Sequence, residues 1–345
     1  MSKKVLITGS DGYIGAVMVP MFIESGYEVV GLDCMFYSEG NLSMEKLVDC
    51  PTIKKDVRDI TEEDLAGEKF DAIVHLAGLS NDPLGKLNSE LTYDINYKAS
   101  VRLAKIAKKV GVKKFIFASS CSLYGQGKEK ALTEESASNP QTAYGKSKIM
   151  TEEALSELAD DDFCPVYMRN ATAFGFSPRM RFDLVVNSLC GFAKVDGEIK
   201  ILGDGTPWRP LVHIKDISGV AIKLIETEDD LIRNQSFNVG DNGENYQIKE
   251  IASLVQEFYP DCKITIAQKD AGDTRDYNVS FNKLNSVLNY KSQWPLKEGI
   301  REIVKRFNDV KLDRSLFENE NFTRLHRIKN LIEQKKLDLN LRRLE

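Results

Sequence analysis

Short apolar runs alternate with amphipathic stretches along the first half of the chain. Residues 4–7 and 28–33 have the apolar pattern of buried strands, and residues 14–25 between them have the pattern of a helix. Further strands and helices are predicted at 52–54, 72–76, 91–109, 115–118, from about 144 onward, and at 165–168. Strands that alternate with helices are typical of an α/β fold with a parallel, doubly wound sheet. We expect this sheet to occupy mainly residues 1–176.

The regular alternation weakens after Phe176, where loops such as 203–207 separate shorter strands and helices. Residues 177–315 are therefore expected to form mainly a smaller α/β substrate-binding lobe. No linker marks a border, so later segments should complete the larger domain and the two lobes should be interleaved in sequence. Residues 316–345 form a tail, which is predicted to dock as an amphipathic helix on its own chain or on a second subunit. Its apolar residues recur at helical steps: Phe322, Leu325, Ile328, Leu331 and Ile332.

Composition excludes several classes of protein. Hydrophobic residues make up 42% of the 345, enough for a large core, and the net charge of −5 without a long basic run argues against nucleic acid as a partner. No apolar stretch approaches the roughly 20 residues of a membrane span, and the first residues do not resemble a signal peptide. Six scattered cysteines indicate free thiols, and three histidines leave little material for a metal site. We expect a cytoplasmic protein that binds neither a membrane nor a metal.

A glycine-rich turn connects the first predicted strand to the first predicted helix. Gly9, Gly12 and Gly15 stand three residues apart where the strand ends and the helix begins. Without side chains the backbone can turn tightly and point its N–H groups at a pyrophosphate, which the helix N-terminus also attracts. The spacing differs by one residue from Gly-x-Gly-x-x-Gly, so the turn is a variant of the dinucleotide-binding fingerprint.

Acidic residues at the ends of the next two strands indicate which dinucleotide binds. Asp33 ends the second predicted strand, where a carboxylate can accept hydrogen bonds from the adenosine ribose and repels a 2′-phosphate. This favours NAD over NADP, although a solvated loop aspartate would have the same spacing. Asp56 and Val57 follow the third strand within reach of the adenine end, and a charged surface loop is the alternative there.

Tyr144 and Lys148 stand four residues apart on a predicted helix, so their side chains share one face. A phenol has a pKa of about 10, and use as a base near neutrality requires a shift of about 3 units, or roughly 4 kcal/mol. One ammonium about 4 Å away can supply about that much at an effective dielectric near 20. The spacing also occurs by chance on solvated helices, so its interpretation depends on the glycine-rich turn in the same chain.

In combination these residues resemble the extended short-chain dehydrogenase/reductase superfamily, in particular its NAD-dependent nucleotide-sugar epimerase/dehydratase family. The resemblance implies a Rossmann fold, NAD as cofactor, a nucleotide-diphosphate sugar as substrate, and a homodimer packed through the helices at 91–109 and 144–159. It covers about residues 3 to 310, and the tail lies outside it. Its motifs occur in the family's order: Thr8 to Gly15, Asp33, Asp56-Val57, His75-Leu76-Ala77-Gly78, Asn96, Ser119 to Gly125, Tyr144-x-x-x-Lys148, Arg169, Phe174-Gly175, Trp208-Arg209-Pro210 and Val212 to Asp216.

The resemblance also implies roles for individual residues. Ser120, Tyr144 and Lys148 would form the catalytic group: the serine binds the reacting sugar oxygen, the tyrosine exchanges the proton and the lysine holds the nicotinamide ribose. Ser119 is the neighbour that could be confused with Ser120. NAD binding would involve Tyr144 and Lys148 together with Thr8, Gly9, Asp11, Gly12, Tyr13, Ile14, Gly15, Asp33, Asp56, Val57, Leu76, Ala77, Gly78 and Asn96.

The two residues after Ser120 bear on the reaction. In the family's 4,6-dehydratases an Asp-Glu pair follows the catalytic hydroxyl and drives the loss of water, whereas Cys121-Ser122 stand here. We therefore expect a nucleotide-sugar C4 epimerase that acts through a transient 4-keto sugar and reversible hydride transfer. The alternatives are a C4 dehydrogenase or ketoreductase, including one acting on GDP-sugars, and a non-catalytic NAD-sensing module, against which the intact catalytic group argues.

Several residues are candidates for substrate binding. Arg209 matches an arginine that binds the diphosphate in UDP-galactose-type epimerases, and a structural salt bridge is the alternative. Arg179 and Arg181 add positive charge, or form a solvated loop pair. A second diphosphate arginine is expected near Asp270, where an acid stands instead, and Arg275 and Lys269 are candidate replacements. The remaining candidates are Ser120, Cys121 and Thr172, the last at a position where the family often has asparagine.

Overall fold

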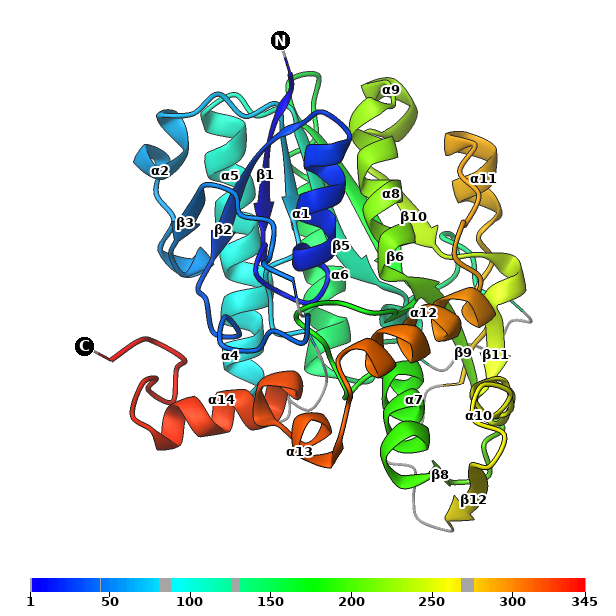
Figure 1. Ribbon diagram of the computed structural model, residues 1–345. Coiled ribbons are helices and arrows are strands. Elements are labelled where there is room, and N and C mark those ends of the chain that lie inside the picture. Colours follow the sequence, from blue (N-terminus) through cyan, green and yellow to red (C-terminus); the bar gives the residue numbers. More distant parts are fainter. Residues whose placement is uncertain (1, 44, 81–87, 126–130, 268–275, 345) are drawn as a thin grey trace.

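The computed structural model describes residues 2–43, 45–80, 88–125, 131–267 and 276–344. A parallel seven-stranded sheet forms the larger lobe, with the strand order β10-β6-β5-β4-β1-β2-β3 (Figure 1). This order confirms the predicted α/β fold with a doubly wound sheet. Its strands are β1 (Lys4–Thr8), β2 (Glu28–Asp33), β3 (Thr52–Lys54), β4 (Ala72–His75), β5 (Lys114–Ser120), β6 (Cys164–Asn170) and β10 (Gln235–Val239).

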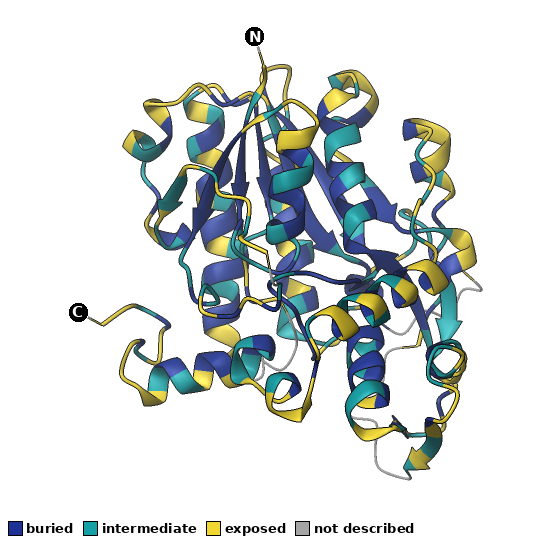
Figure 2. Ribbon diagram, viewed as in Figure 1, coloured by how far each residue is buried: buried dark blue, intermediate teal, exposed yellow. Residues whose placement is uncertain are grey.

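Helices cover both faces of this sheet, because successive residues of its strands are apolar on both sides. Val5 and Ile7 of β1 belong to the core on one face, whereas Leu6 between them belongs to the core on the other face. The strands are accordingly buried between two layers of helices (Figure 2). One layer contains α1 (Gly15–Glu24), α8 (Ile214–Glu226) and α9 (Asp229–Ile232), and the other contains α2 (Glu62–Ala66), α5 (Ala99–Lys109) and α6 (Ala143–Ser156).

The helix predicted over 91–109 is interrupted, which the sequence pattern did not indicate. It consists of α4 (Ser89–Tyr93), a π-helical turn at Asp94–Lys98, and α5. The wider turn contains the buried Asn96, whose Oδ1 accepts a hydrogen bond from the Leu79 N–H at 2.7 Å and whose Nδ2 donates to the Leu79 carbonyl at 3.0 Å. Such turns often occur at functional sites. Here the turn fixes the loop that follows β4.

A smaller lobe lies at the carboxyl ends of the strands (Figure 1). A three-stranded sheet in the order β11-β9-β7 and a parallel pair of β12 with β8 form its framework. The chain enters this lobe more than once, because α8 and β10, which belong to the larger lobe, lie in sequence between segments of the smaller lobe. Its elements are β7 (Thr172–Phe174), α7 (Val185–Asp196), β8 (Glu198–Leu202), β9 (Trp208–His213), β11 (Asn245–Gln247), α10 (Ile248–Gln256), β12 (Lys263–Ala267) and α12 (Leu296–Asp309). The helix α11 (Asn282–Leu288) packs instead against β10 of the larger lobe, where Leu284 and Leu288 join the same apolar cluster as Phe237.

The tail returns to the larger lobe after α13 (Arg314–Phe317). Its helix α14 (Arg324–Glu333) buries Ile328 and Leu331 in the same apolar cluster as Leu103 of α5. The segment after α14 adds Leu337 and Leu341 to that cluster. The amphipathic helix thus packs against its own chain. None of the helices in the described parts of the chain is long and apolar enough to cross a membrane.

Candidate active site

A cavity of about 710 Å³ lies at the carboxyl ends of the strands, between the two lobes. Its wall contains the glycine-rich turn and the end of β2 as well as Ser120, Tyr144 and Lys148. Arg181 and Arg209 of the second half of the chain also line it. The structure therefore brings together in one cavity most of the residues that the sequence assigned to cofactor, catalysis and substrate.

The glycine-rich turn leaves no room for side chains. A Cβ at Gly15 would lie 2.1 Å from the Gly9 carbonyl oxygen, and one at Gly12 would lie 3.1 Å from the same atom. Gly9 has a φ of +72°, and its Cβ would lie 3.0 Å from the Ala77 nitrogen. At these three positions the turn that leads into α1 therefore presents backbone to the cavity, a geometry suited to binding a pyrophosphate. The predicted residues that line the cavity here are Gly9, Gly12, Tyr13, Ile14, Gly15, Leu76, Ala77 and Gly78.

Three predicted cofactor residues do not line the cavity but hold its walls. The Thr8 hydroxyl accepts a hydrogen bond from the Ala77 N–H at 3.1 Å and bonds to Nδ1 of His75 at 2.7 Å. Asn96 fixes the Leu79 backbone, as described above. Asp11 forms an ion pair with Arg179. These three side chains are hydrogen-bonded or ion-paired within the protein and support the walls of the cavity. Their predicted contact with NAD stays a prediction.

Asp33 and Asp56 lie at the other end of the cavity, where β2 and β3 finish. The carboxylate of Asp33 accepts hydrogen bonds from the N–H groups of Met35 at 2.7 Å and Asp11 at 3.0 Å. Burial nevertheless raises the pKa of Asp33 to about 6. Asp56 caps the short turn that contains Val57 by accepting a hydrogen bond from the Arg58 N–H at 2.9 Å. A buried carboxylate beside the glycine-rich turn fits the adenosine half of a dinucleotide.

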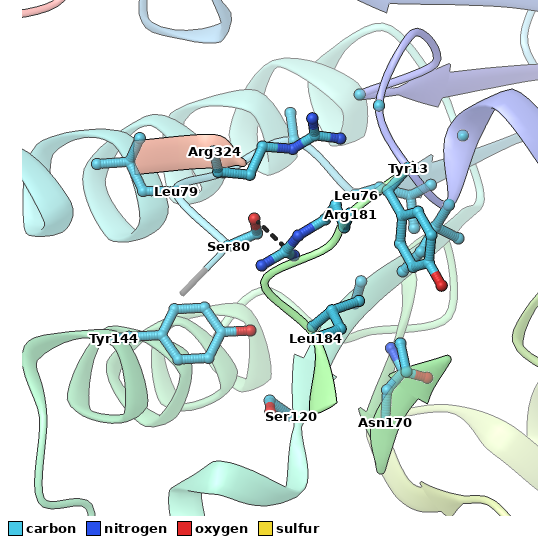
Figure 3. A pocket seen from close by; sticks show the side chains of 18 of the residues that line it. Tyr13, Leu76, Leu79, Ser80, Ser120, Tyr144, Asn170, Arg181, Leu184 and Arg324 are labelled. Carbon is cyan, nitrogen blue, oxygen red and sulfur yellow. Dashed lines mark hydrogen bonds between the residues drawn. The ribbon is translucent and has the colours of Figure 1, made fainter. Parts of the chain in front are cut away.

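Tyr144 and Lys148 occupy the first turns of α6, which begins where Thr142 caps the N–H of Gly145. The ammonium of Lys148 donates a hydrogen bond to the Ala118 carbonyl at 2.6 Å and lies 5.5 Å from the centroid of the Tyr144 ring. Burial lowers the pKa of Lys148 to about 8, so the group is still mainly protonated at neutral pH. Both side chains line the cavity, and the tyrosine hydroxyl points into it (Figure 3).

The structure distinguishes Ser120 from its neighbour Ser119. The hydroxyl of Ser119 donates a hydrogen bond to Glu152, a carboxylate that forms an ion pair with Arg169. The hydroxyl of Ser120 lines the cavity and accepts a hydrogen bond from the Ser122 N–H at 3.2 Å, where β5 passes into a 3₁₀ turn. Ser120 therefore retains a hydroxyl proton to donate to a bound molecule, which supports its assignment.

Two of the predicted substrate residues are placed elsewhere. The thiol of Cys121 is fully buried and points at the Arg169 carbonyl, 3.0 Å from Sγ, and it does not line the cavity. Burial also raises the pKa of this thiol. The guanidinium of Arg179 binds Asp11, with Nε 2.9 Å from Oδ1, and is likewise outside the lining. The sequence predictions for Cys121 and Arg179 are wrong in this respect, because a 3₁₀ turn and an internal ion pair direct the side chains inward.

The other predicted substrate residues have different outcomes. Thr172, Arg181 and Arg209 line the cavity. Arg181 forms an ion pair with Asp183 at 2.8 Å, and its Nη1 donates to the Ser80 hydroxyl at 3.1 Å (Figure 3). Arg275 and Lys269 lie outside the described residues.

Sequence reasoning missed several polar groups of the wall. The Ser122 hydroxyl and the Asn170 Oδ1 are buried there without a hydrogen-bond partner, and both follow or end strands whose carboxyl ends meet at the cavity. That position was the available signal for them. Arg324 of α14 also lines the cavity. Nothing in its amphipathic helix pattern indicated that it would reach the site.

Comparison with known families identifies this class of site. The sequence model of the NAD dependent epimerase/dehydratase family matches residues 5–240. The chain belongs to this family. The cofactor of this protein is accordingly NAD, and the glycine-rich turn and the buried Asp33 fit that group. The protein is thus an NAD-dependent enzyme of the epimerase/dehydratase type.

The relatives within the family include proteins of similar length. UDP-glucose 4-epimerase 2 of Arabidopsis thaliana is 26% identical, over 88% of this chain and 94% of that protein. UDP-glucose 4-epimerase of Bacillus subtilis (strain 168) is 25% identical, over 87% and 94%. The structure of UDP-glucose 4-epimerase from Thermotoga maritima with UDP-glucose is 25% identical, with a TM-score of 0.78 over 90% of this chain and all of that one. MoeE5 in complex with UDP-glucuronic acid and NAD, at 23% identity and a TM-score of 0.77, shares the fold.

Proposed function

We propose that this protein is an NAD-dependent nucleotide-sugar C4 epimerase. The observation that carries the proposal is the chemistry around Ser120, Tyr144 and Lys148, which can bind an alcohol and exchange its proton but cannot readily eliminate water. The UDP-glucose 4-epimerases among the relatives support the same substrate class.

Each catalytic residue has a defined task in this proposal. When bound, NAD would supply reversible hydride transfer at C4 of the sugar. Tyr144 takes the proton of the C4 hydroxyl and later gives it back, while Ser120 donates a hydrogen bond to the same oxygen. The buried ammonium of Lys148 favours the phenolate electrostatically, and its hydrogen bond to Ala118 keeps it in place.

Elimination of water would require a further acid and base beside the sugar, and the described part of the cavity wall supplies none there. Its carboxylates are Asp33 and Asp56 at the adenosine end and Asp183, which forms an ion pair with Arg181. The thiol of Cys121 is directed away from the cavity. The position taken by two acids in the 4,6-dehydratases thus has no acid or base facing the cavity, which favours epimerisation over dehydration.

The substrate would lie toward the smaller lobe, from which Thr172 and Arg209 enter the cavity wall. A guanidinium fork suits a diphosphate because it can donate two parallel hydrogen bonds. The unpartnered Ser122 hydroxyl and Asn170 Oδ1 are further polar groups that can bind sugar hydroxyls. We therefore assign the nucleotide-diphosphate sugar to this end and NAD to the end at Asp33.

The outcome of the reaction can be tested by NMR on the purified full-length protein with NAD and a panel of UDP- and GDP-sugars in D₂O. An epimerase converts a sugar to its C4 epimer without net reduction of NAD and without deuterium on carbon. Release of a 4-keto sugar with equimolar reduced cofactor would instead identify a C4 dehydrogenase. Deuterium on carbon beside a lost hydroxyl would reveal a dehydratase, and either of these results would overturn the proposal.

A further inference from the structure

The tail wraps the adenosine end of the cavity. It contacts the two chain segments that follow Asp33 and Asp56 through ion pairs, arginine–aromatic contacts and hydrogen bonds from arginine side chains to carbonyl oxygens. Because both segments belong to the cavity wall, the tail determines the shape of that end. The hydrogen bonds to carbonyl oxygens are those from Arg343 to Cys34 at 2.9 Å and Met35 at 3.3 Å, from Arg327 to Phe36 at 3.0 Å, and from Arg58 to Asn340 at 2.8 Å and Leu341 at 3.1 Å.

Arg324, the first residue of α14, extends from the tail into the cavity wall (Figure 3). Its side chain is 3% exposed, and its guanidinium carbon lies 3.9 Å from the centroid of the Tyr37 ring. One guanidinium nitrogen, Nη2, donates a hydrogen bond to the Arg179 carbonyl at 3.3 Å. The other, Nη1, is buried and donates to no group of the protein.

Arg324 differs from two other arginines near the cavity, each of which forms an ion pair with an aspartate. Arg179 is paired with Asp11, and Arg181 is paired with Asp183. Among the described residues no carboxylate forms an ion pair with Arg324, and Asp183 and Asp33 act on it only as nearby charges. Burial lowers the pKa of Arg324 to about 10, so the guanidinium is still a cation at neutral pH. A buried cation with an unused donor is costly unless an anion binds it.

We propose that Arg324 binds a phosphate group of NAD, so that the tail forms part of the cofactor site. A cofactor phosphate is favoured over the phosphates of the nucleotide sugar because Tyr37, which holds the guanidinium, lies on the segment after Asp33. The other tail contacts also lie at that end. The inference rests on the NAD site of the proposed enzyme and not on whether it epimerises its substrate.

The test is a set of calorimetric titrations of cofactor-stripped, full-length protein with NAD, ADP, adenosine and UDP-glucose. Arg324→Met should weaken the binding of NAD and ADP by about ten- to a hundredfold, the worth of a hydrogen bond to a charged group. Binding of adenosine, which has no phosphate, should change by less than about twofold. Binding of UDP-glucose should be unchanged. The matched control is Lys329→Met, which removes the same charge from the exposed side of the same helix and should leave all four affinities unchanged.

Each other outcome has a clear meaning. Equal losses of affinity for adenosine and ADP would show that Arg324 has a merely structural role. A loss of affinity confined to UDP-glucose would show that Arg324 binds a phosphate of the substrate. Either result would overturn the proposal. If Arg324→Met does not fold, Arg324→Lys carries the test. Lysine keeps the cation but not the planar fork, so ADP binding should weaken by a few fold and adenosine binding should not. Failure of the wild-type protein to bind NAD would reject the cofactor site itself, whereas phosphate-independent losses reject only the role of Arg324.

Discussion

The two ends of the cavity are built in different ways. The catalytic end comes from successive elements, since Ser120 ends β5 and Tyr144 and Lys148 begin α6. The adenosine end joins parts that are distant in sequence, as in the hydrogen bond from Arg327 to the Phe36 carbonyl, which spans 291 residues. The family match includes the first set and stops long before the tail. The proposed chemistry thus lies in one local module, whereas the proposed phosphate contact of Arg324 comes from a segment outside the family match.

The largest effect on activity is expected from Tyr144→Phe, which should impair the catalytic end of the cavity and leave the adenosine end unchanged. Loss of the hydroxyl removes the group that exchanges the proton, so turnover of the nucleotide sugar should fall by about 10² to 10⁴. The NAD affinity should change little, because the phenyl ring is kept. Turnover by NMR and NAD binding by calorimetry check the two halves of this prediction. Wild-type turnover in the variant would remove Tyr144 from the proposed mechanism and revive the interpretation as a non-catalytic NAD sensor.

Lys148→Met should lower activity and raise stability together. An ammonium 5.5 Å from the Tyr144 ring contributes roughly 3 kcal/mol at an effective dielectric near 20, so turnover at pH 7 should fall by about a hundredfold. The pH optimum should rise, because the charge that favours the phenolate is gone. An unchanged rate and pH profile would contradict the assignment of Lys148.

The stability change follows from the pKa of Lys148, which is lowered from 10.5 to about 8 in the folded protein by burial. Between these values the unfolded chain binds the proton and the native protein does not, so stability increases as the pH rises from about 8 to 10.5. Below about pH 8 the buried ammonium costs stability, on the order of 3 kcal/mol at most. Methionine avoids that cost, and Lys148→Met should therefore have a higher melting temperature at pH 7.

The same contrast explains what could be predicted from the sequence. Strand ends and helix periodicity are local, so they placed Ser120 just after a strand and Tyr144 with Lys148 on one helix face. The resemblance to the family then implied that the three residues share one site. Arg179 and Arg181 are two residues apart in a loop, where no periodicity indicates that one binds Asp11 and the other reaches the cavity. The position of Arg324 depends on how α14 docks on distant elements. Its apolar stripe predicted a buried face but not the surface that receives it.

The tail should contribute to stability through its apolar face. Ile328 is fully buried in the cluster shared with α5, so Ile328→Ala should reduce the free energy of unfolding by about 2 to 4 kcal/mol. NAD binding should weaken as well, because α14 carries Arg324. Leu339→Ala is the matched control, since Leu339 is 77% exposed on the same tail and its truncation should cost less than about 0.5 kcal/mol. Chemical denaturation measures both values, and equal losses in the two variants would mean that the tail is not anchored at Ile328.

The smallest effect is expected at the outer surface of the tail. Arg342 forms ion pairs with Asp59 and Asp56, but its side chain is 37% exposed. Exposed pairs of this kind contribute about 0 to 1 kcal/mol and are screened by salt, so Arg342→Met should reduce the free energy of unfolding by no more than that. NAD affinity should stay within about twofold of the wild type, in contrast to Arg324→Met, because the tail is held by buried apolar and carbonyl contacts. A tenfold loss of NAD affinity that disappears at high salt would show instead that surface charge positions the tail.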